Sequence, residues 1–145
     1  MIRELARDDL DPLLELYQQF GHDDGPPVER AVLEATWREI CDSPGVLHLG
    51  VFEGGALRAA AHASITPNLT RRAHPYAVVE NVVTHEAHRR KGHGRRVMEA
   101  LIDACRERGC YKIMLLSGTT RPEAHRFYEK LGFDRGAKQA FLYRF

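Results

Sequence analysis

The chain has 145 residues, a length that suits one domain with its own hydrophobic core. An apolar fraction of 43%, a charged fraction of 28% and a net charge of +1 are ordinary for a globular chain and disfavour a nucleic-acid-binding protein. No apolar run approaches the length of a membrane span, and no basic segment followed by an apolar one opens the chain, so we expect neither membrane insertion nor secretion. The three cysteines, Cys41, Cys105 and Cys110, lack metal-type spacing and indicate reduced thiols in the cytoplasm.

Apolar periodicity and turn residues divide the chain into alternating helices and strands. Asp8 or Asp9 is expected to cap the first helix, and Gly54-Gly55 is typical of a two-residue hairpin turn. In chain order the expected elements are a strand over 1–5, a helix carrying Leu10 to Tyr17, a helix over 28–41, strands over 46–53, 56–65 and 76–83, a helix over 94–108, a strand over 111–116, a short helix up to Leu131, and one or two closing strands over 133–145.

Two features refine the second half of this order. The nearly uninterrupted apolar run over 111–116 favours a strand buried on both faces. Thr120 and Glu123 form a capping-box pattern at the start of the last helix, and Gly132 is its expected stop. No repeat, low-complexity tract or linker interrupts the elements, so we expect a single domain over 1–145.

The strongest functional signal is a basic glycine turn between the strand over 76–83 and the helix over 94–108. Gly92 and Gly94 let the backbone approach an anion closely, and the start of a helix attracts negative charge. The turn lacks the GxxxxGK[ST] pattern of a P-loop and the third glycine of a dinucleotide fingerprint. On spacing alone, a phosphate site and a solvated basic turn both stay open.

Two blocks resemble the GCN5-related N-acetyltransferase (GNAT) superfamily. The first is Arg89-Arg90-Lys91-Gly92-His93-Gly94, which is similar to the signature Q/R-x-x-G-x-G/A. The second is Ala124-His125-Arg126-Phe127-Tyr128-Glu129-Lys130-Leu131-Gly132-Phe133, which is similar to A-x-x-F-Y-x-x-x-G-F. The element order also resembles that of the superfamily over nearly the whole chain. The resemblance implies an α+β GNAT fold, with a mixed sheet flanked by helices, acetyl-coenzyme A (acetyl-CoA) as donor and a primary amine as acceptor.

Donor-binding roles follow from the resemblance by position. Backbone amides from Lys91 to Arg96 are expected to bind the pyrophosphate, and the edge from Val82 to Thr84 is expected to pair with the pantetheine arm. Arg90 stands where many members have glycine, and Arg121 where many have an asparagine. The residues expected to bind the cofactor are Val82, Val83, Thr84, Arg89, Arg90, Lys91, Gly92, His93, Gly94, Arg95, Arg96, Arg121 and Phe127.

Aminolysis of a thioester needs a base for the amine and an acid for the leaving thiolate. The resemblance makes Tyr128 the acid, although its helical spacing alone would place it in the core. Glu80 interrupts an apolar strand and is either the base or a salt-bridged edge acid. We expect direct attack of the amine without a covalent enzyme intermediate. The residues expected to select the acceptor, or else to serve only as surface turns, are His22, Asp23, Asp24, Asn68 and His74.

His85, His88 and His93 cluster in the sequence, but no nearby acid or cysteine completes a ligand set, so we expect no metal. The pattern is nearest to small-molecule amine acetyltransferases, among them those for glucosamine 6-phosphate and aminoalkylphosphonates. A protein or peptide N-acetyltransferase and a non-catalytic acyl-CoA-binding module remain alternatives, and a nucleic-acid patch is the weakest reading. The oligomeric state stays open, with a homodimer as the form that is common among the relatives.

Overall fold

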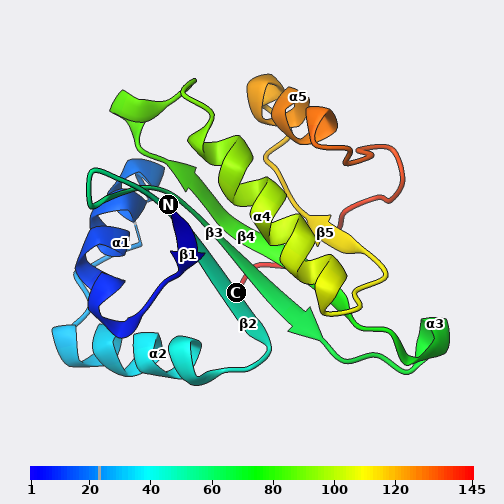
Figure 1. Ribbon diagram of the computed structural model, residues 1–145, viewed down its shortest axis with the longest axis horizontal. Coiled ribbons are helices and arrows are strands. Elements are labelled where there is room, and N and C mark those ends of the chain that lie inside the picture. Colours follow the sequence, from blue (N-terminus) through cyan, green and yellow to red (C-terminus); the bar gives the residue numbers. More distant parts are fainter. Residues whose placement is uncertain (23) are drawn as a thin grey trace.

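The computed structural model describes residues 1–22 and 24–145. Five strands form one sheet in the order β1-β2-β3-β4-β5, with antiparallel pairing throughout except for the parallel pair β4–β5. The strands are β1 (Ile2–Glu4), β2 (Val46–Glu53), β3 (Ala56–Thr66), β4 (Tyr76–Thr84) and β5 (Ile113–Leu115). The helices are α1 (Leu10–Tyr17), α2 (Arg30–Asp42), α3 (Thr70–Ala73), α4 (His93–Glu107) and α5 (Pro122–Lys130), with 3-10 turns η1 (Arg7–Asp9), η2 (Gln18–Phe20) and η3 (Glu86–His88). The expected mixed sheet flanked by helices is therefore confirmed (Figure 1).

The sheet separates two hydrophobic cores, because successive side chains of a strand point to opposite faces. On one face Leu47 and Val51 of β2 pack with Val97 and Leu101 of α4. On the other face Phe52 belongs to the core that α1 and α2 cover. The strand β3 is rich in alanine, and its fully buried Ala59, Ala60, Ala61 and Ala63 contribute to both cores. These small side chains let a helix approach the sheet on each side.

The strand β4 changes its pairing at Asn81, which has a φ of 53° in the left-handed region. Its register with β3 shifts beside this residue, as in a β-bulge. On the opposite edge β4 pairs with β5 only from Ala77 to Val79. Among the residues that the structure describes, no strand pairs with this edge of β4 from Glu80 to Thr84. The sheet therefore opens where the glycine turn begins.

Three sequence expectations about the last third of the chain are wrong. Residues 134–145 form no helix or strand, and the aromatic side chains near the end are exposed instead of pairing with the sheet. The strand β5 is short and half-buried at the sheet edge, whereas burial on both faces was expected. The capping box is also absent, because Arg121 is the N-cap of α5 and Pro122 holds the first helical position, where a fixed φ starts the helix.

Asp9 holds the N-cap position of α1, as expected, but its carboxylate makes no cap hydrogen bond to that helix. It accepts hydrogen bonds from Arg3 at 2.6 and 2.9 Å and from the Ala6 amide at 2.7 Å. Arg3 lowers the pKa of this buried carboxyl, and burial opposes the shift. Asp9 thus ties β1 to the start of α1. In the part of the chain that is described, no helix has the length and apolar character that crossing a membrane requires.

Candidate active site

The glycine turn follows η3 and leads directly into α4, with Gly92 as the N-cap at a φ of 83°. The Arg96 amide donates to the Gly92 carbonyl, so the amides that precede it, at His93, Gly94 and Arg95, have no acceptor inside the helix. Amides without an acceptor in the helix, at the positive end of a helix dipole, suit a phosphate group. The expected pyrophosphate turn therefore has the required geometry.

The basic side chains of this turn lie at the surface. Arg89, Arg90 and Lys91 are exposed, and Arg95 forms an ion pair with Glu99 at 2.7 Å. Arg90 has a φ of 61°, a conformation that glycine adopts freely and that costs other residues about 1 kcal/mol or more. The positive φ thus explains why glycine, which the resemblance gives for many members of the superfamily, suits the position that Arg90 occupies here.

Gly94 lies where the start of α4, the end of β4 and α5 meet. A Cβ atom built on Gly94 would lie 2.7 Å from Oγ1 of Thr84 and 3.7 Å from Cζ of Phe127. A side chain at this position would push α4 away from β4. The unpaired edge of β4 and the free amides of α4 are thereby held next to one another.

Tyr128 lies on α5 and packs its ring against the core under α4, with ring centroids 5.1 Å from Phe127 and 5.9 Å from Phe133. Burial raises the pKa of its phenol, Arg121 opposes the shift, and Glu80 adds to it. The phenol is therefore protonated at neutral pH and lies near the open edge of β4. The ring is part of the core, as its helical spacing predicts, and the role of the hydroxyl as an acid stays a prediction.

Glu80 precedes the bulge in β4 and pairs in register with His62 of β3. Its side chain is exposed, so the burial that the base role was expected to use is absent. Burial lowers the pKa of His62, and the negative charge of Glu80 opposes that shift. Glu80 therefore lies at the edge of the sheet with an exposed carboxylate, and its role as the base stays a prediction.

A cavity of about 360 Å³ lies over the sheet between α1 and α2. Tyr17, His48, His62 and Asn81 supply its polar groups. Its remaining lining is largely apolar and consists of Leu10, Leu13, Leu14, Val28, Val32, Leu33, Thr36, Trp37 and Ile40. None of these described lining residues is a lysine or arginine.

The polar groups of this cavity form a connected set. The Tyr17 hydroxyl and Nε2 of His48 share a hydrogen bond of 3.0 Å, and His48 stacks on His62 with ring centroids 5.1 Å apart. Burial, together with a smaller effect of His62, lowers the pKa of His48 to about 4, so the ring is neutral at pH 7. Burial raises the pKa of Tyr17, and a hydrogen bond to Asn81 opposes this. Reasoning from the sequence missed this set, although a histidine within each of two apolar strands was a visible signal.

The residues expected to select the acceptor do not gather at this cavity. His22 stacks on Phe20 with centroids 5.5 Å apart, Asp24 is exposed, and Asp23 lies outside the described residues. Asn68 donates to Thr70 at 2.8 Å within its own loop, which bends back through the single turn α3. Nδ1 of His74 contacts the Gly109 carbonyl at 3.0 Å, beyond the C-terminal end of α4 and away from the glycine turn (Figure 1). Asn68 and His74 therefore make local contacts in a loop near the C-terminal end of α4, whereas the glycine turn lies at the N-terminal end of that helix.

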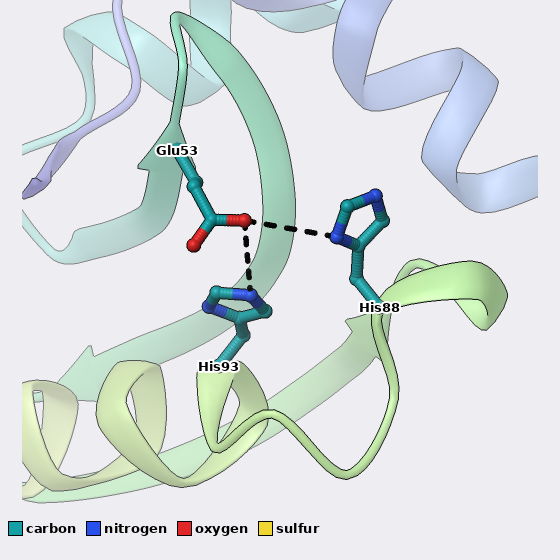
Figure 2. Close-up of side chains that lie close together, drawn as sticks. All are labelled: Glu53, His88 and His93. Carbon is teal, nitrogen blue, oxygen red and sulfur yellow. Dashed lines mark ion pairs between the residues drawn. The ribbon is translucent and has the colours of Figure 1, made fainter.

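A second side-chain cluster lies beside the glycine turn and joins Glu53, His88 and His93 (Figure 2). Oε2 of Glu53 lies 3.7 Å from Nδ1 of His88 and 3.7 Å from Nε2 of His93. The ring of His93 is buried and turned toward Glu53, so this residue can offer only its backbone amide to a phosphate. The sequence expectation of no metal depended on a missing acid, and the fold supplies one from β2.

Comparison of the chain with known proteins finds acetyltransferases in both sequence and structure. Residues 8–133 match the Acetyltransferase (GNAT) family. Glucosamine 6-phosphate N-acetyltransferase 1 of Oryza sativa subsp. japonica is 33% identical over 122 residues, which are 81% of this chain and 72% of the relative. Glucosamine 6-phosphate N-acetyltransferase of Trypanosoma brucei brucei is 31% identical, over 97% of this chain and 93% of the relative. A putative acetyltransferase from Agrobacterium tumefaciens str. C58 has a solved structure with a TM-score of 0.92 and 40% identity, covering 99% of each chain.

These matches span nearly the whole chain and include both blocks on which the resemblance was based. The chain therefore belongs to the GNAT family, and the protein is an acetyltransferase.

Proposed function

We propose that this acetyltransferase uses acetyl-CoA and transfers the acetyl group by direct attack to a primary amine of a small molecule. The observation that carries the proposal is the opening of the sheet, where an unpaired edge of β4 adjoins the free amides at the start of α4. A pantetheine arm carries amides that can hydrogen-bond to a strand edge, while its pyrophosphate fits a helix start. The proposed donor therefore matches both features at once.

The proposed chemistry is aminolysis of a thioester. The nitrogen of a neutral amine attacks the acetyl carbonyl carbon, and the carbon–sulfur bond breaks as the amide forms. The proton of the amine passes to the Glu80 carboxylate through water, and the Tyr128 hydroxyl protonates the departing thiolate. Backbone amides of β4 next to the bulge at Asn81 would stabilise the negative charge that develops on the carbonyl oxygen. Cysteine nucleophiles are unnecessary in this scheme, and burial raises the thiol pKa of both Cys105 and Cys110.

The acceptor is proposed to approach from the α1 and α2 side of the sheet, where the cavity beside Glu80 offers Tyr17, His48 and Asn81 as polar contacts. Two relatives are named for glucosamine 6-phosphate, so this amino sugar phosphate is the first acceptor to test. The cavity favours a second class of acceptor, because its lining is largely apolar. Within the described part of the chain, this lining also contains no lysine or arginine that could pair with a phosphate group. That class is a primary amine with an apolar body.

The test is coenzyme A release from acetyl-CoA with a panel of amines. The panel holds glucosamine 6-phosphate, glucosamine, arylalkylamines, aminophosphonates, polyamines and peptides with free N-termini. Turnover of a small amine with at least ten times the kcat/KM of any peptide supports the proposal, and the reverse order supports a peptide N-acetyltransferase. Binding of coenzyme A without turnover of any amine would support the acyl-CoA-binding module.

The proposal includes a homodimer in the cytoplasm. Phe141, Tyr143 and Phe145 are 89%, 83% and 117% exposed, and exposed apolar side chains grouped in this way commonly mark an interface. Sedimentation of the full chain should give twice the monomer mass, and the double substitution F141S/F145S should shift it toward the monomer. A wild-type monomer at micromolar concentration would remove this part of the proposal. The free thiols of Cys41, Cys105 and Cys110 support a reducing compartment.

A further inference from the structure

The cluster of Glu53, His88 and His93 brings an acid from the end of β2 to two histidines that flank the glycine turn (Figure 2). Glu53 ends β2, His88 ends η3, and His93 is the first residue of α4. Each side chain offers one atom that can bind a metal, and these three atoms lie within 4.8 Å of one another. The cluster therefore joins the β2–β3 hairpin to both ends of the glycine turn.

The distances inside the cluster are unlike those of hydrogen bonds. Oε2 of Glu53 lies 3.7 Å from each of the two imidazole nitrogens, beyond the usual range of about 2.7–3.2 Å for a hydrogen bond. Two ligands of a tetrahedral zinc ion lie roughly 3.3 Å apart, given bonds of about 2.0–2.1 Å. The side chains are therefore spaced as ligands around an ion, and small rotations would close the set.

Burial provides an independent observation. The ring of His93 is only 3% exposed, yet neither of its nitrogens has a hydrogen-bond partner among the described residues. Nδ1 of His88 is also buried without a partner there. Buried polar groups are normally satisfied, so an orphaned imidazole that faces a carboxylate points to a ligand.

We propose that Nδ1 of His88, Nε2 of His93 and a carboxylate oxygen of Glu53 bind a divalent transition metal ion of the zinc class. Two imidazoles and one carboxylate suit such an ion, whereas calcium and magnesium prefer sites made entirely of oxygen. These residues supply three ligands, and since the Glu53 side chain is 55% exposed, solvent can supply a fourth. The ion holds the glycine turn against the end of β2 and so stabilises the fold.

This proposal does not depend on acetyl transfer, so its test uses neither acetyl-CoA nor an amine. The full chain without an affinity tag is treated with a chelator, dialysed, and titrated with Zn²⁺ by calorimetry. Absorption of visible light by Co²⁺ reports coordination geometry in a parallel titration. We expect one Zn²⁺ per chain with a Kd in the micromolar range or below. A concentration about 100 times the Kd should raise the Tm by roughly 5–10 °C.

The substitution Glu53→Gln tests the ligand set at an exposed position, where it leaves the core intact. It should weaken Zn²⁺ binding at least about 10-fold, because even the loss of a residue that only supports a ligand costs this much. At the same Zn²⁺ concentration the Tm shift should therefore fall to about half of the wild-type shift or less. Glu86→Gln is the matched control, since Glu86 is an exposed acid on η3 outside the cluster, and its binding should equal that of the wild type.

Two results would overturn the proposal. If Glu53→Gln and Glu86→Gln bind Zn²⁺ equally well, other histidines hold the ion. If the wild type gives no saturable heat up to about 100 µM Zn²⁺, the cluster is only a contact between Glu53 and the two imidazoles.

Discussion

A Cβ atom on Gly94 would lie 2.7 Å from Oγ1 of Thr84, closer than side chains pack in proteins. Gly94→Ala should therefore displace the start of α4 from β4 and weaken coenzyme A binding about 10-fold, as measured by calorimetry. The double variant G94A/T84A removes the clashing oxygen and should restore most of the affinity. An alanine at position 94 that binds coenzyme A like the wild type would show that the close contact does not position the turn.

Asn81 offers a test of the bulge in β4. Its φ of 53° costs a β-branched residue about 1–2 kcal/mol but is free for glycine. Asn81→Val should therefore lower the free energy of unfolding by about that amount and reduce kcat, since the strand would straighten toward β5. Asn81→Gly should keep the stability and most of the coenzyme A affinity. Urea unfolding and steady-state kinetics measure both, and equal stability of the two variants would contradict the role of the bulge.

Tyr128→Phe tests the proposed acid. The phenyl ring keeps its packing against Phe127 and Phe133, so the stability should change little. Loss of the hydroxyl should lower kcat by roughly 10²–10⁴-fold while the KM for acetyl-CoA stays within about 3-fold. A variant with wild-type kcat would leave Tyr128 as a core residue, which its helical spacing already explains.

Glu80→Gln tests the proposed base and separates it from a structural acid. Glu80 is exposed at the edge of the sheet, so the variant should fold with wild-type stability. Its kcat should fall roughly 10²–10⁴-fold. The loss should be smaller for an amine of lower pKa, because a larger fraction of that amine is already neutral at the assay pH. Glu99→Gln on α4, an exposed acid that pairs with Arg95, is the matched control. Equal losses for every amine would argue against proton removal by Glu80.

His48 predicts an unusual dependence of stability on pH. Its pKa is about 4 in the folded protein and about 6.5 in the unfolded chain, so as pH falls the unfolded chain takes up the proton first. The stabilisation is complete above pH 6.5 and is lost as pH falls toward 4, at up to about 1.4 kcal/mol per pH unit. Between pH 7 and 5, urea unfolding should show a loss about 2 kcal/mol larger for the wild type than for His48→Gln. The same change at exposed His22 should keep the wild-type slope.

Sequence reasoning succeeded where local chemistry decides the structure. Apolar periodicity placed α4 and β2, and Gly54-Gly55 marked the hairpin between β2 and β3, because such features need only neighbouring residues. The basic glycine turn was recognised for the same reason. Its two glycines, the strand before it and the helix after it lie within one short segment.

The remainder depends on contacts between distant segments, which no local pattern contains. Glu53 joins His88 and His93 only because the hairpin end folds over the glycine turn. Likewise, Tyr17 meets His48 through the packing of α1 on the sheet. The closing strands over 133–145 were wrong for the same reason: residues 134–145 do not pair with the sheet, and pairing with a distant strand depends on contacts that a segment's own sequence does not contain.

The alanines of β3 limit how this enzyme can change. Ala59 and Ala61 belong to the core under α4, whereas Ala60 belongs to the core that α1 and α2 cover, and all three are completely buried. A bulkier residue at any of these positions would push the helices of that face away from the sheet and disturb β3, which contributes to both cores. We therefore expect a changed preference for amines to arise from substitutions in α1 and α2, whose side chains line the cavity. The middle of the sheet should tolerate few substitutions, because it packs against helices on both faces.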